Sequence, residues 1–311
     1  MRRTAAAALD RYDLEIERFR HLAQHTNTVF RVDTPDGPRA LRVGAPPEDT
    51  LVDTRVEVAW LAALAADTSI SVVQPLPNRE GSLITPVEVE GVPGVRTCVL
   101  FSWVPGRAVA EAASPDVYRR LGETAAVLHD HGETWRPPKG SPLVWDRTFY
   151  YPDEPVILFD VEHRHLMDGE RTRIVRRVLE RAEAELARHH ADGRPGIVHG
   201  DLHPDNVHWH RGRLHVFDFE DAMVARPVQD VAITLFYGRN RPDYSELRAA
   251  FEEGYRSRRE WPVEFEGQLE LLMAARTIMF INYVLRLGLE PEEYLPQAVD
   301  RIAANAERFE W

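Results

Sequence analysis

HGDLHPDN, at residues 199–206, and VFDFED, at residues 216–221, are the two stretches that decide the fold of this chain. In the first stretch Asp201 and Asn206 lie five positions apart, and Asp218 in the second stretch follows Asp201 by seventeen. The apolar run LHVF ends immediately before Asp218, so a strand end would project that side chain. A phosphoryl-transfer site requires one carboxylate to accept a hydroxyl proton, and a carboxamide with a second carboxylate to hold Mg²⁺.

The same spacing occurs in protein kinases, as His-Arg-Asp-x-x-x-x-Asn followed by Asp-Phe-Gly. Here Gly200 replaces the Arg, Phe219-Glu220 replaces the Phe-Gly, and His203-Pro204 lies inside the loop. With these differences the chain closely resembles the aminoglycoside phosphotransferase and choline/homoserine kinase-like superfamily. The resemblance spans residues 25 to 240 in order, and the last seventy residues only in being helical. It implies an α+β, bilobal protein-kinase-like fold.

The pattern of the N-terminal third is consistent with the small, β-rich lobe of that fold. The turn signal DTPDGP separates two apolar runs at residues 29–32 and 40–43, which predicts a hairpin. Helical spacing predicts a main helix over residues 53–66, and the opening around 5–23 is also predicted to be helical. Strands are expected at 71–73, 82–85 and 97–101. We therefore divide the chain into a nucleotide-binding N-lobe, 1–103, and a larger, mainly helical catalytic C-lobe, 104–311.

The resemblance assigns roles to the residues of the two motifs. Asp201 corresponds to the catalytic base that accepts the proton of the attacking hydroxyl, or orients it. Asn206 and Asp218 correspond to the Mg²⁺ ligands, and hard oxygen donors of this kind are what Mg²⁺ prefers. Three further residues are expected to support the catalytic loop: His199, His203 and Asp230.

The N-lobe is expected to hold ATP. Arg42 occupies the place of the usual Lys that reaches the phosphates, and Glu57 on the following helix is its natural partner. An arginine fork binds phosphate differently from a lysine point charge. The phosphate-covering loop has no glycine, and Asn27 and Thr28 are expected to offer backbone amides and side chains to the phosphates. The adenine is expected beside the hinge, near Phe101 and Trp103.

The acceptor is expected between the irregular 132–160 segment and the helices after residue 230. For Glu220 and Asp221 two interpretations stay open: one of them lines the metal or binds a polar substrate, or both are solvated turn residues, which is slightly favoured. By location alone, the candidate acceptor residues are Trp145, Asp146, Tyr150, Glu220, Asp221, Tyr237 and Arg276.

The net charge and the residue composition limit the kinds of partner and the cellular location that are expected. The net charge of −12 disfavours a nucleic-acid partner, because phosphate backbones require a basic surface, and it mildly favours a cationic acceptor. The single cysteine, Cys98, excludes an internal disulfide and fits a reducing compartment. We find no export signal and no apolar stretch of the length of a membrane span, so a cytoplasmic protein without a membrane partner is expected. The sequence does not define an oligomeric state.

The sequence thus predicts ATP- and Mg²⁺-dependent transfer of the γ-phosphoryl group to a hydroxyl of a small molecule: an aminoglycoside, an amino alcohol, homoserine or a sugar-like acceptor. One alternative is a bacterial stress-type protein Ser/Thr kinase, although the twelve residues from Asp218 to Asp230 leave little room for a peptide platform. A second alternative is a catalytically silent nucleotide-binding pseudokinase, which the Arg at position 42 favours and the retained acidic motifs oppose.

Overall fold

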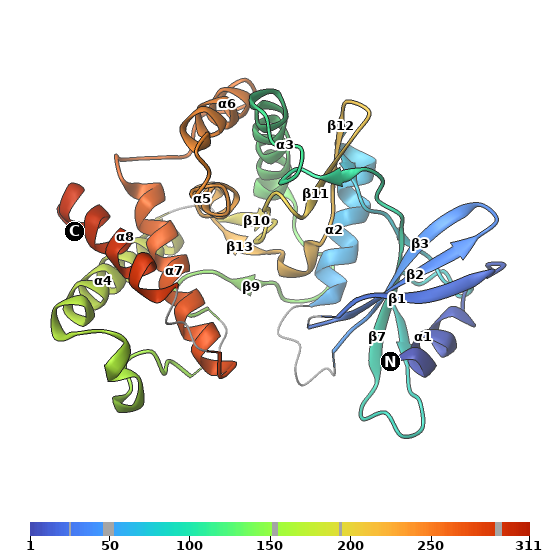
Figure 1. Cartoon of the computed structure of the whole chain (residues 1–311). Helices are drawn as coiled ribbons and strands as arrows, with labels where there is room; N and C mark the ends of the chain where they lie inside the picture. The colour runs from blue at the N-terminus through green and yellow to red at the C-terminus, as the bar shows by residue number, and fades with distance from the viewer. Residues whose placement is uncertain (25, 46–52, 151–154, 193–194, 290–293) are drawn as a thin grey trace.

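Two lobes lie side by side in the computed structural model, which describes residues 1–24, 26–45, 53–150, 155–192, 195–289 and 294–311. Figure 1 shows an antiparallel sheet forming one lobe and a mainly helical region forming the other, with α2 (Thr54–Asp67) between them. The predicted α+β bilobal kinase-like fold is confirmed. The division between residues 103 and 104 stays a prediction, although the last N-lobe strand ends at Ser102.

The N-lobe sheet is antiparallel, with the order β1-β2-β3-β7-β5, and β6 also pairs with β7. The predicted hairpin is confirmed, because Val29 pairs with Arg42 across two seven-residue strands. The strands of the sheet are β1 (Arg18–Gln24), β2 (Thr28–Thr34), β3 (Gly37–Val43), β5 (Pro75–Leu76), β6 (Thr85–Val87) and β7 (Arg96–Ser102).

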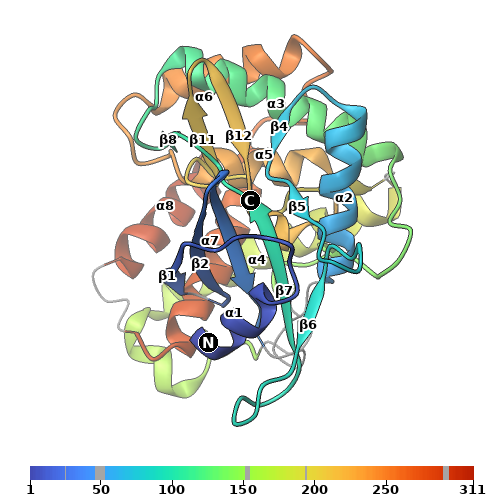
Figure 2. The ribbon, with the colours of Figure 1, turned by 90° about the vertical axis from the view of Figure 1, so that its right-hand side faces the viewer.

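Successive side chains along these strands point to opposite sides of the sheet, so its two faces carry different residues. Phe30, Val32 and Leu41 lie on the outer face and pack against α1 (Arg2–Leu9), which covers that face in Figure 2. Residues of opposite parity, Arg31 and Arg42 among them, lie on the inner face. The buried outer face therefore fixes the register that places Arg42 on the side of the second lobe.

The prediction of a helix over residues 5–23 is wrong in its second half. The helix ends at Leu9, and β1 begins at Arg18 as an exposed edge strand. Leu14, Ile16 and Phe19 are partly buried against the core beneath α1, and β1 gains the ladder of hydrogen bonds to β2. Tertiary pairing therefore overrides the local helical spacing.

The main helix α2 connects the lobes. Asp53 caps it by accepting a hydrogen bond from the Arg55 amide, in keeping with the start predicted at residue 53. On its buried face, Trp60 packs edge-on against Phe219 at 5.4 Å and donates its Nε1–H to His131 Nδ1 at 3.0 Å. The helix thus lies directly on the turn that follows Asp218.

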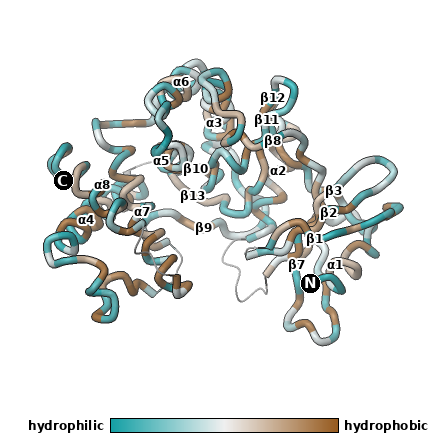
Figure 3. The backbone as a smooth tube through the Cα atoms, viewed as in Figure 1, coloured by the Kyte–Doolittle hydropathy of each residue, from teal (hydrophilic) through white to brown (hydrophobic). Residues whose placement is uncertain are grey.

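The catalytic segments of the second lobe are short strands joined by tight turns. Two strands differ from prediction: β4 (Ser71–Val72) pairs in parallel with β12 in the C-lobe and not with the N-lobe sheet, and the strand expected at 82–85 begins only at Thr85, as β6. The polar turn between β11 and β12 projects from the molecule in Figure 3. The other elements here are β8 (Arg107–Ala108), β9 (Leu143–Val144), β10 (Gly196–Val198), β11 (Val207–His210), β12 (Arg213–Val216), the 3₁₀ turn η3 (Phe219–Asp221) and β13 (Met223–Ala225).

Six α-helices build the bulk of this lobe among the described residues. A separate apolar core joins α4, α7 and α8. By length and composition α7 could cross a membrane, contrary to the expectation that no stretch could; however, 72% of its apolar window is buried inside the protein, as in a core helix. The helices are α3 (Pro115–Thr134), α4 (Gly169–Asp192), α5 (Pro227–Phe236), α6 (Tyr244–Arg256), α7 (Gln268–Arg286) and α8 (Leu295–Arg308), and η2 (Val161–Leu166) is a 3₁₀ turn.

Helices α3 and α6 cross at two glycines. A Cβ placed on Gly254 would lie 1.8 Å from the Arg119 carbonyl oxygen, and one on Gly122 would lie 2.0 Å from the Phe251 carbonyl oxygen. Backbone atoms cannot yield as a flexible side chain can, so the two helices must separate to admit a methyl group.

We expect Gly254→Ala to lower the free energy of unfolding by about 1–3 kcal/mol, because overpacking outweighs the better helix propensity of alanine. Urea unfolding followed by tryptophan fluorescence measures the change. Gly169→Ala is the matched control, since nothing lies within 4 Å of a Cβ at that position. Equal stability of the two variants would contradict the close crossing.

Candidate active site

The catalytic loop leaves β10 through a glycine that no other residue could replace without strain. Gly200 has φ +81°, and a Cβ there would lie 2.1 Å from the Asp221 carbonyl oxygen. His199 then fixes the loop: its Nε2 donates to the Phe217 carbonyl at 3.0 Å, and its Nδ1 accepts from the Asp201 amide at 3.3 Å. His199 therefore occupies the supporting position predicted for it, with both ring nitrogens used.

Asp230 anchors this loop from below. It is fully buried at the start of α5; its Oδ1 accepts from the Gly200 amide at 2.9 Å and its Oδ2 lies 3.0 Å from His129 Nε2. His129 Nδ1 in turn lies 2.8 Å from the Tyr255 hydroxyl. The sequence predicted Asp230, but not His129 or Tyr255, which belong to α3 and α6.

Three side chains contact the Asp201 carboxylate: a guanidinium, an imidazole and a carboxamide. Its Oδ1 accepts from Arg276 Nη2 at 3.1 Å, and its Oδ2 is 3.4 Å from both His203 Nε2 and Asn206 Nδ2. Burial raises the pKa of this carboxyl, but the His203 hydrogen bond and the Arg276 charge lower it more. The net result is a pKa below the ordinary value, so Asp201 is ionised at neutral pH.

Asn206 and Asp218 are brought together by the β11–β12 hairpin. Val207 pairs with Val216, and the Phe217 amide donates to the Asn206 carbonyl at 3.1 Å, so the two candidate ligands flank one end of the ladder. Asp218 itself has φ 65° and ψ 58°, a left-handed conformation that non-glycine residues seldom adopt. Strain of this kind persists only where the surrounding structure holds it.

The donor set fits a hard divalent cation. Asn206 Nδ2 donates to the Asp201 backbone carbonyl at 3.0 Å, which leaves its side-chain oxygen as the group able to bind a metal. Asp218 is exposed and Glu220 lies two residues beyond it. Burial, and then the neighbouring Asp218 carboxylate, raise the pKa of Glu220 to about 8. A concentration of acidic oxygens of this kind is relieved by a bound cation.

The N-lobe contributes a buried guanidinium. Arg42 forms a two-pronged ion pair with Glu57: Nη1 lies 2.8 Å from Oε1, and Nη2 donates to Oε2. Phe101 lies beneath the guanidinium at 5.2 Å. Burial alone would lower the pKa of Arg42, but the Glu57 carboxylate more than reverses this, so the pKa is raised. The pairing expected from the sequence is therefore present, with Arg in place of Lys.

Glu220 links the two lobes across the site. Its Oε2 is 3.6 Å from Arg42 Nη1 and also accepts from Asn27 Nδ2. Asn27 Oδ1 accepts from the Ala45 amide at 3.2 Å. The sequence left Glu220 open between a site residue and a solvated turn residue, and the contacts place it at the phosphate end of the site.

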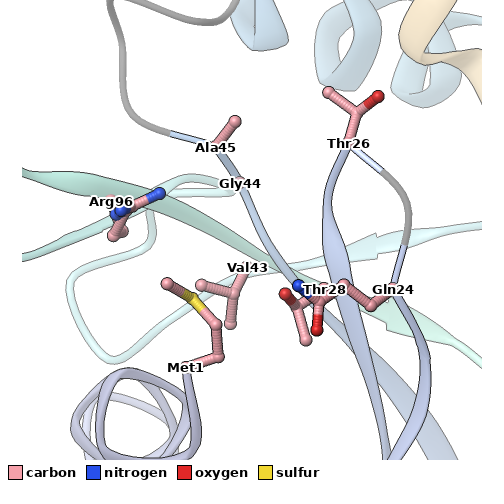
Figure 4. Close-up of a pocket in the computed structure, with 8 residues that line it drawn as sticks. All are labelled: Met1, Gln24, Thr26, Thr28, Val43, Gly44, Ala45 and Arg96. Carbon is pink, nitrogen blue, oxygen red and sulfur yellow. The ribbon is translucent and has the colours of Figure 1, made fainter. Parts of the chain in front are cut away.

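Thr28 does not lie with Asn27, which corrects the expectation that both side chains face the phosphates. Thr28 pairs with Val43 on the outer face of the sheet, whereas Val29 pairs with Arg42. Thr28 lines a cavity of about 310 Å³ with Gln24 and Arg96, and Figure 4 shows these side chains around it. Strand alternation places the side chains of adjacent residues on opposite faces, so the Thr28 hydroxyl faces away from Arg42.

The adenine-side residues share the inner face of the sheet. Phe101 is 7% exposed, and Trp103 is half-buried with the Arg31 guanidinium 4.7 Å above its ring. They lie where β7 ends and the chain passes into the second lobe. A flat ring there is compatible with the predicted adenine position, which stays a prediction.

The acceptor candidates separate into two groups. Tyr150, Tyr237 and Arg276 gather at Asp201: Arg276 Nη1 donates to the Tyr150 hydroxyl at 2.9 Å, and the Tyr237 hydroxyl is 3.5 Å from Nη2. The Tyr237 ring also lies 4.6 Å from the ring of His203. Asp221 is near enough to raise the pKa of Tyr237, after the larger effects of burial and Asp201.

The other two candidates, Trp145 and Asp146, have other partners than Asp201. Asp146 is paired with the neighbouring Arg147 at 2.7 Å. Trp145 is 4% exposed, packs 5.5 Å from the Tyr150 ring, and accepts from Gln229 Nε2 through its backbone. Trp145 supports Tyr150 from the core, and the expectation that Trp145 and Asp146 face the acceptor stays a prediction.

A second group with metal-ligating side chains lies elsewhere, at Glu185, His189 and Glu264, whose ligand atoms lie within 4.8 Å of one another. Arg188 donates to both carboxylates, at 2.8 and 2.6 Å, so its charge already compensates theirs. This group is a structural link between α4 and the start of α7.

We expect Asp230→Ala to lower the free energy of unfolding by about 1–3 kcal/mol for each buried partner left unsatisfied, namely the Gly200 amide and His129. The catalytic loop loses its anchor, so turnover should fall as well. Asp230→Asn should be milder, because its amide can accept from Gly200 and donate to the other tautomer of His129. Urea unfolding and steady-state kinetics of both variants measure this. Equal loss in both variants would contradict the hydrogen-bond geometry.

Comparison with known proteins agrees with this geometry. The sequence model of the phosphotransferase enzyme family matches residues 7–264. The amicoumacin kinase of Bacillus subtilis (strain 168) is 25% identical over 244 residues, which are 74% of this chain and 66% of that protein. An uncharacterized protein of Synechocystis, sll1119, is 24% identical over 265 residues, or 84% of this chain and 71% of that one.

Solved structures share the fold. A microcompartment-associated aminopropanol kinase superposes with a TM-score of 0.76 at 22% identity, covering 99% of this chain and 97% of that one. An amicoumacin kinase in complex with AMP-PNP, Ca²⁺ and Ami superposes with a TM-score of 0.79 at 19% identity, covering 97% and 92%. At these identities the likeness describes the fold.

Proposed function

Because the chain belongs to the phosphotransferase enzyme family, it is a small-molecule kinase that uses ATP, and we propose that Asp201, Asn206 and Asp218 carry the transfer. The observation that carries the proposal is the convergence of these three residues: the Gly200 turn and the β11–β12 hairpin place them at one end of a short ladder. Arg42, held by Glu57, faces the same end from the other lobe.

In the proposed reaction the acceptor hydroxyl donates a hydrogen bond to Asp201. The hydroxyl oxygen attacks the γ-phosphorus, the bond from that phosphorus to the bridging oxygen of ADP breaks, and the hydroxyl proton passes to Asp201. A base of depressed pKa suffices, because a loose transition state removes the proton late. Catalysis then consists of positioning and charge neutralisation.

Asn206 and Asp218 would hold Mg²⁺, which neutralises phosphate charge when bound. The related amicoumacin kinase structure contains Ca²⁺ with a nucleotide analogue, and Mg²⁺ is our own assignment from the oxygen donor set. Arg42 adds a fixed positive charge on the nucleotide side. The second carboxylate beside Arg42 is that of Glu220, 3.6 Å from Nη1, which also accepts from Asn27.

We propose a hydroxylated small molecule as the acceptor, in a cytoplasmic setting. The related proteins are named for amicoumacin, aminopropanol and spectinomycin, and the acidic total charge of this chain suits a cationic amino alcohol or aminoglycoside. Between Asp218 and Asp230 the chain forms η3, β13 and the start of α5. This compact segment supports a small acceptor over a protein acceptor.

We expect Asp201→Asn to lower kcat by about 10²–10⁴-fold, the usual contribution of a positioned base, while MgATP still binds. ADP release from MgATP is followed across amino alcohols, aminoglycosides, sugars, homoserine and a generic protein, beside the wild type. Nucleotide affinity is measured by calorimetry. Undiminished turnover in the variant would contradict the role of Asp201, and phosphorylation of the protein acceptor alone would support the protein-kinase alternative.

Removal of divalent cations with EDTA should abolish turnover, and added Mg²⁺ should restore it. Asp218→Ala should lose turnover at all Mg²⁺ concentrations, or require far more Mg²⁺, because it removes a ligand. Asp300→Asn, an exposed carboxylate paired with Arg171, is the matched control and should retain wild-type activity. Full activity of the wild type without a divalent cation would contradict the metal role.

A further inference from the structure

We propose that Arg276 is a positioning residue for the reaction: it orients the Asp201 carboxylate, and Tyr150 holds the arginine in place. The inference rests on the proposed function and extends it to three segments that are distant in sequence. Asp201 lies in the catalytic loop, Tyr150 in the irregular segment before α4, and Arg276 in the middle of α7. Neither motif of the catalytic loop indicates this arrangement.

Among the described residues, Arg276 makes the shortest side-chain contact to the Asp201 carboxylate. Arg276 Nη2 is 3.1 Å from Oδ1, whereas His203 and Asn206 approach Oδ2 only to 3.4 Å. Rotation of the carboxylate about its Cβ–Cγ bond would move both oxygens and so disturb the contact to Arg276 together with the two longer ones. The charge-assisted hydrogen bond of Arg276 is therefore the main constraint on the direction of the oxygen lone pairs.

The arginine is itself fixed at its other end. Arg276 Nη1 donates to the Tyr150 hydroxyl at 2.9 Å, and only 10% of the arginine side chain is exposed. Tyr150 is 4% exposed and packs 5.5 Å from Trp145, whose backbone bonds to β13 and α5. A guanidinium that bridges two partners in one plane has a single orientation, which a lysine ammonium cannot reproduce.

Because Arg276 bridges Tyr150 and Asp201, its role differs from that of Arg42. Arg42 is paired with Glu57 on the nucleotide side, whereas Arg276 has no nucleotide-side contact among the described residues. Its loss should therefore alter the chemical step and leave nucleotide binding intact. A misdirected carboxylate lowers the fraction of bound hydroxyl that is ready for attack.

The experiment compares wild type, Arg276→Ala, Arg276→Lys, Tyr150→Phe and Asp201→Asn with MgATP and an acceptor that the wild type phosphorylates. We expect kcat to fall about 10²-fold in Arg276→Ala, less in Arg276→Lys, and least in Tyr150→Phe. The KM for MgATP should stay within about twofold of wild type. Millimolar guanidinium should restore part of kcat in Arg276→Ala, and none in Asp201→Asn. Arg177→Ala, exposed on α4, controls for the effect of guanidinium on the assay.

Three results would overturn the inference while leaving the proposed function intact. Unchanged kcat with a raised KM for the acceptor would make Arg276 a binding contact only. A lowered melting temperature with no guanidinium rescue and equal loss in Arg276→Lys would make it structural. A loss of MgATP affinity would place it on the nucleotide side. By contrast, a wild type that turns over no acceptor of the panel would count against the proposed function itself.

Discussion

The buried carboxylate of Asp230 is the interaction on which the rest of the site depends. It is fully inaccessible to solvent, and it bonds at once to the Gly200 amide of the catalytic loop and to His129 of α3. A buried carboxylate is costly unless every lone pair finds a donor, so the positions of α3, α5 and the loop are coupled through it. Asp201 directly follows Gly200, so the hydrogen bond from the Gly200 amide to Asp230 also fixes the backbone of Asp201.

A second constraint joins the lobes. The α2 helix contributes Trp60 to the turn after Asp218, and it contributes Glu57 to the ion pair with Arg42. Because both side chains project from one rigid helix, a shift of α2 would move the phosphate-side cation and the metal-side turn together. The α2 helix therefore fixes Arg42 at the nucleotide end of the site, just as Asp230 fixes the catalytic loop.

Whether the sequence could predict an interaction depends on how far apart its two residues lie along the chain. Asp201 and Asn206 lie in the loop before one local hairpin and Asp218 follows it, so their spacing alone indicates their proximity. Strand alternation explains why Arg42 lies on the inner face. The same alternation shows why Thr28 cannot accompany Asn27.

The partnerships that sequence reasoning missed are non-local. His129 and Asp230 are 101 positions apart, and Arg276 and Asp201 are 75 apart, so no spacing rule connects them. The edge strand β1 was missed for a related reason: its hydrogen bonds come from β2, and its own apolar spacing does not exclude a helix. The sequence could predict the residues of the local motifs, but it could not predict the contacts between distant segments that orient their side chains.

The acidic total charge of the chain is a poor guide to the charge within the site. Asp201, Asp218 and Glu220 lie between two buried guanidinium groups, Arg42 on the nucleotide side and Arg276 on the acceptor side. Both arginines carry raised pKa values, since burial lowers them less than their acidic and phenolic neighbours raise them. Both are therefore permanent cations. The Asp201 carboxylate stays ionised without a bound substrate, and the acceptor meets a carboxylate whose direction, rather than its basicity, has been set by the fold.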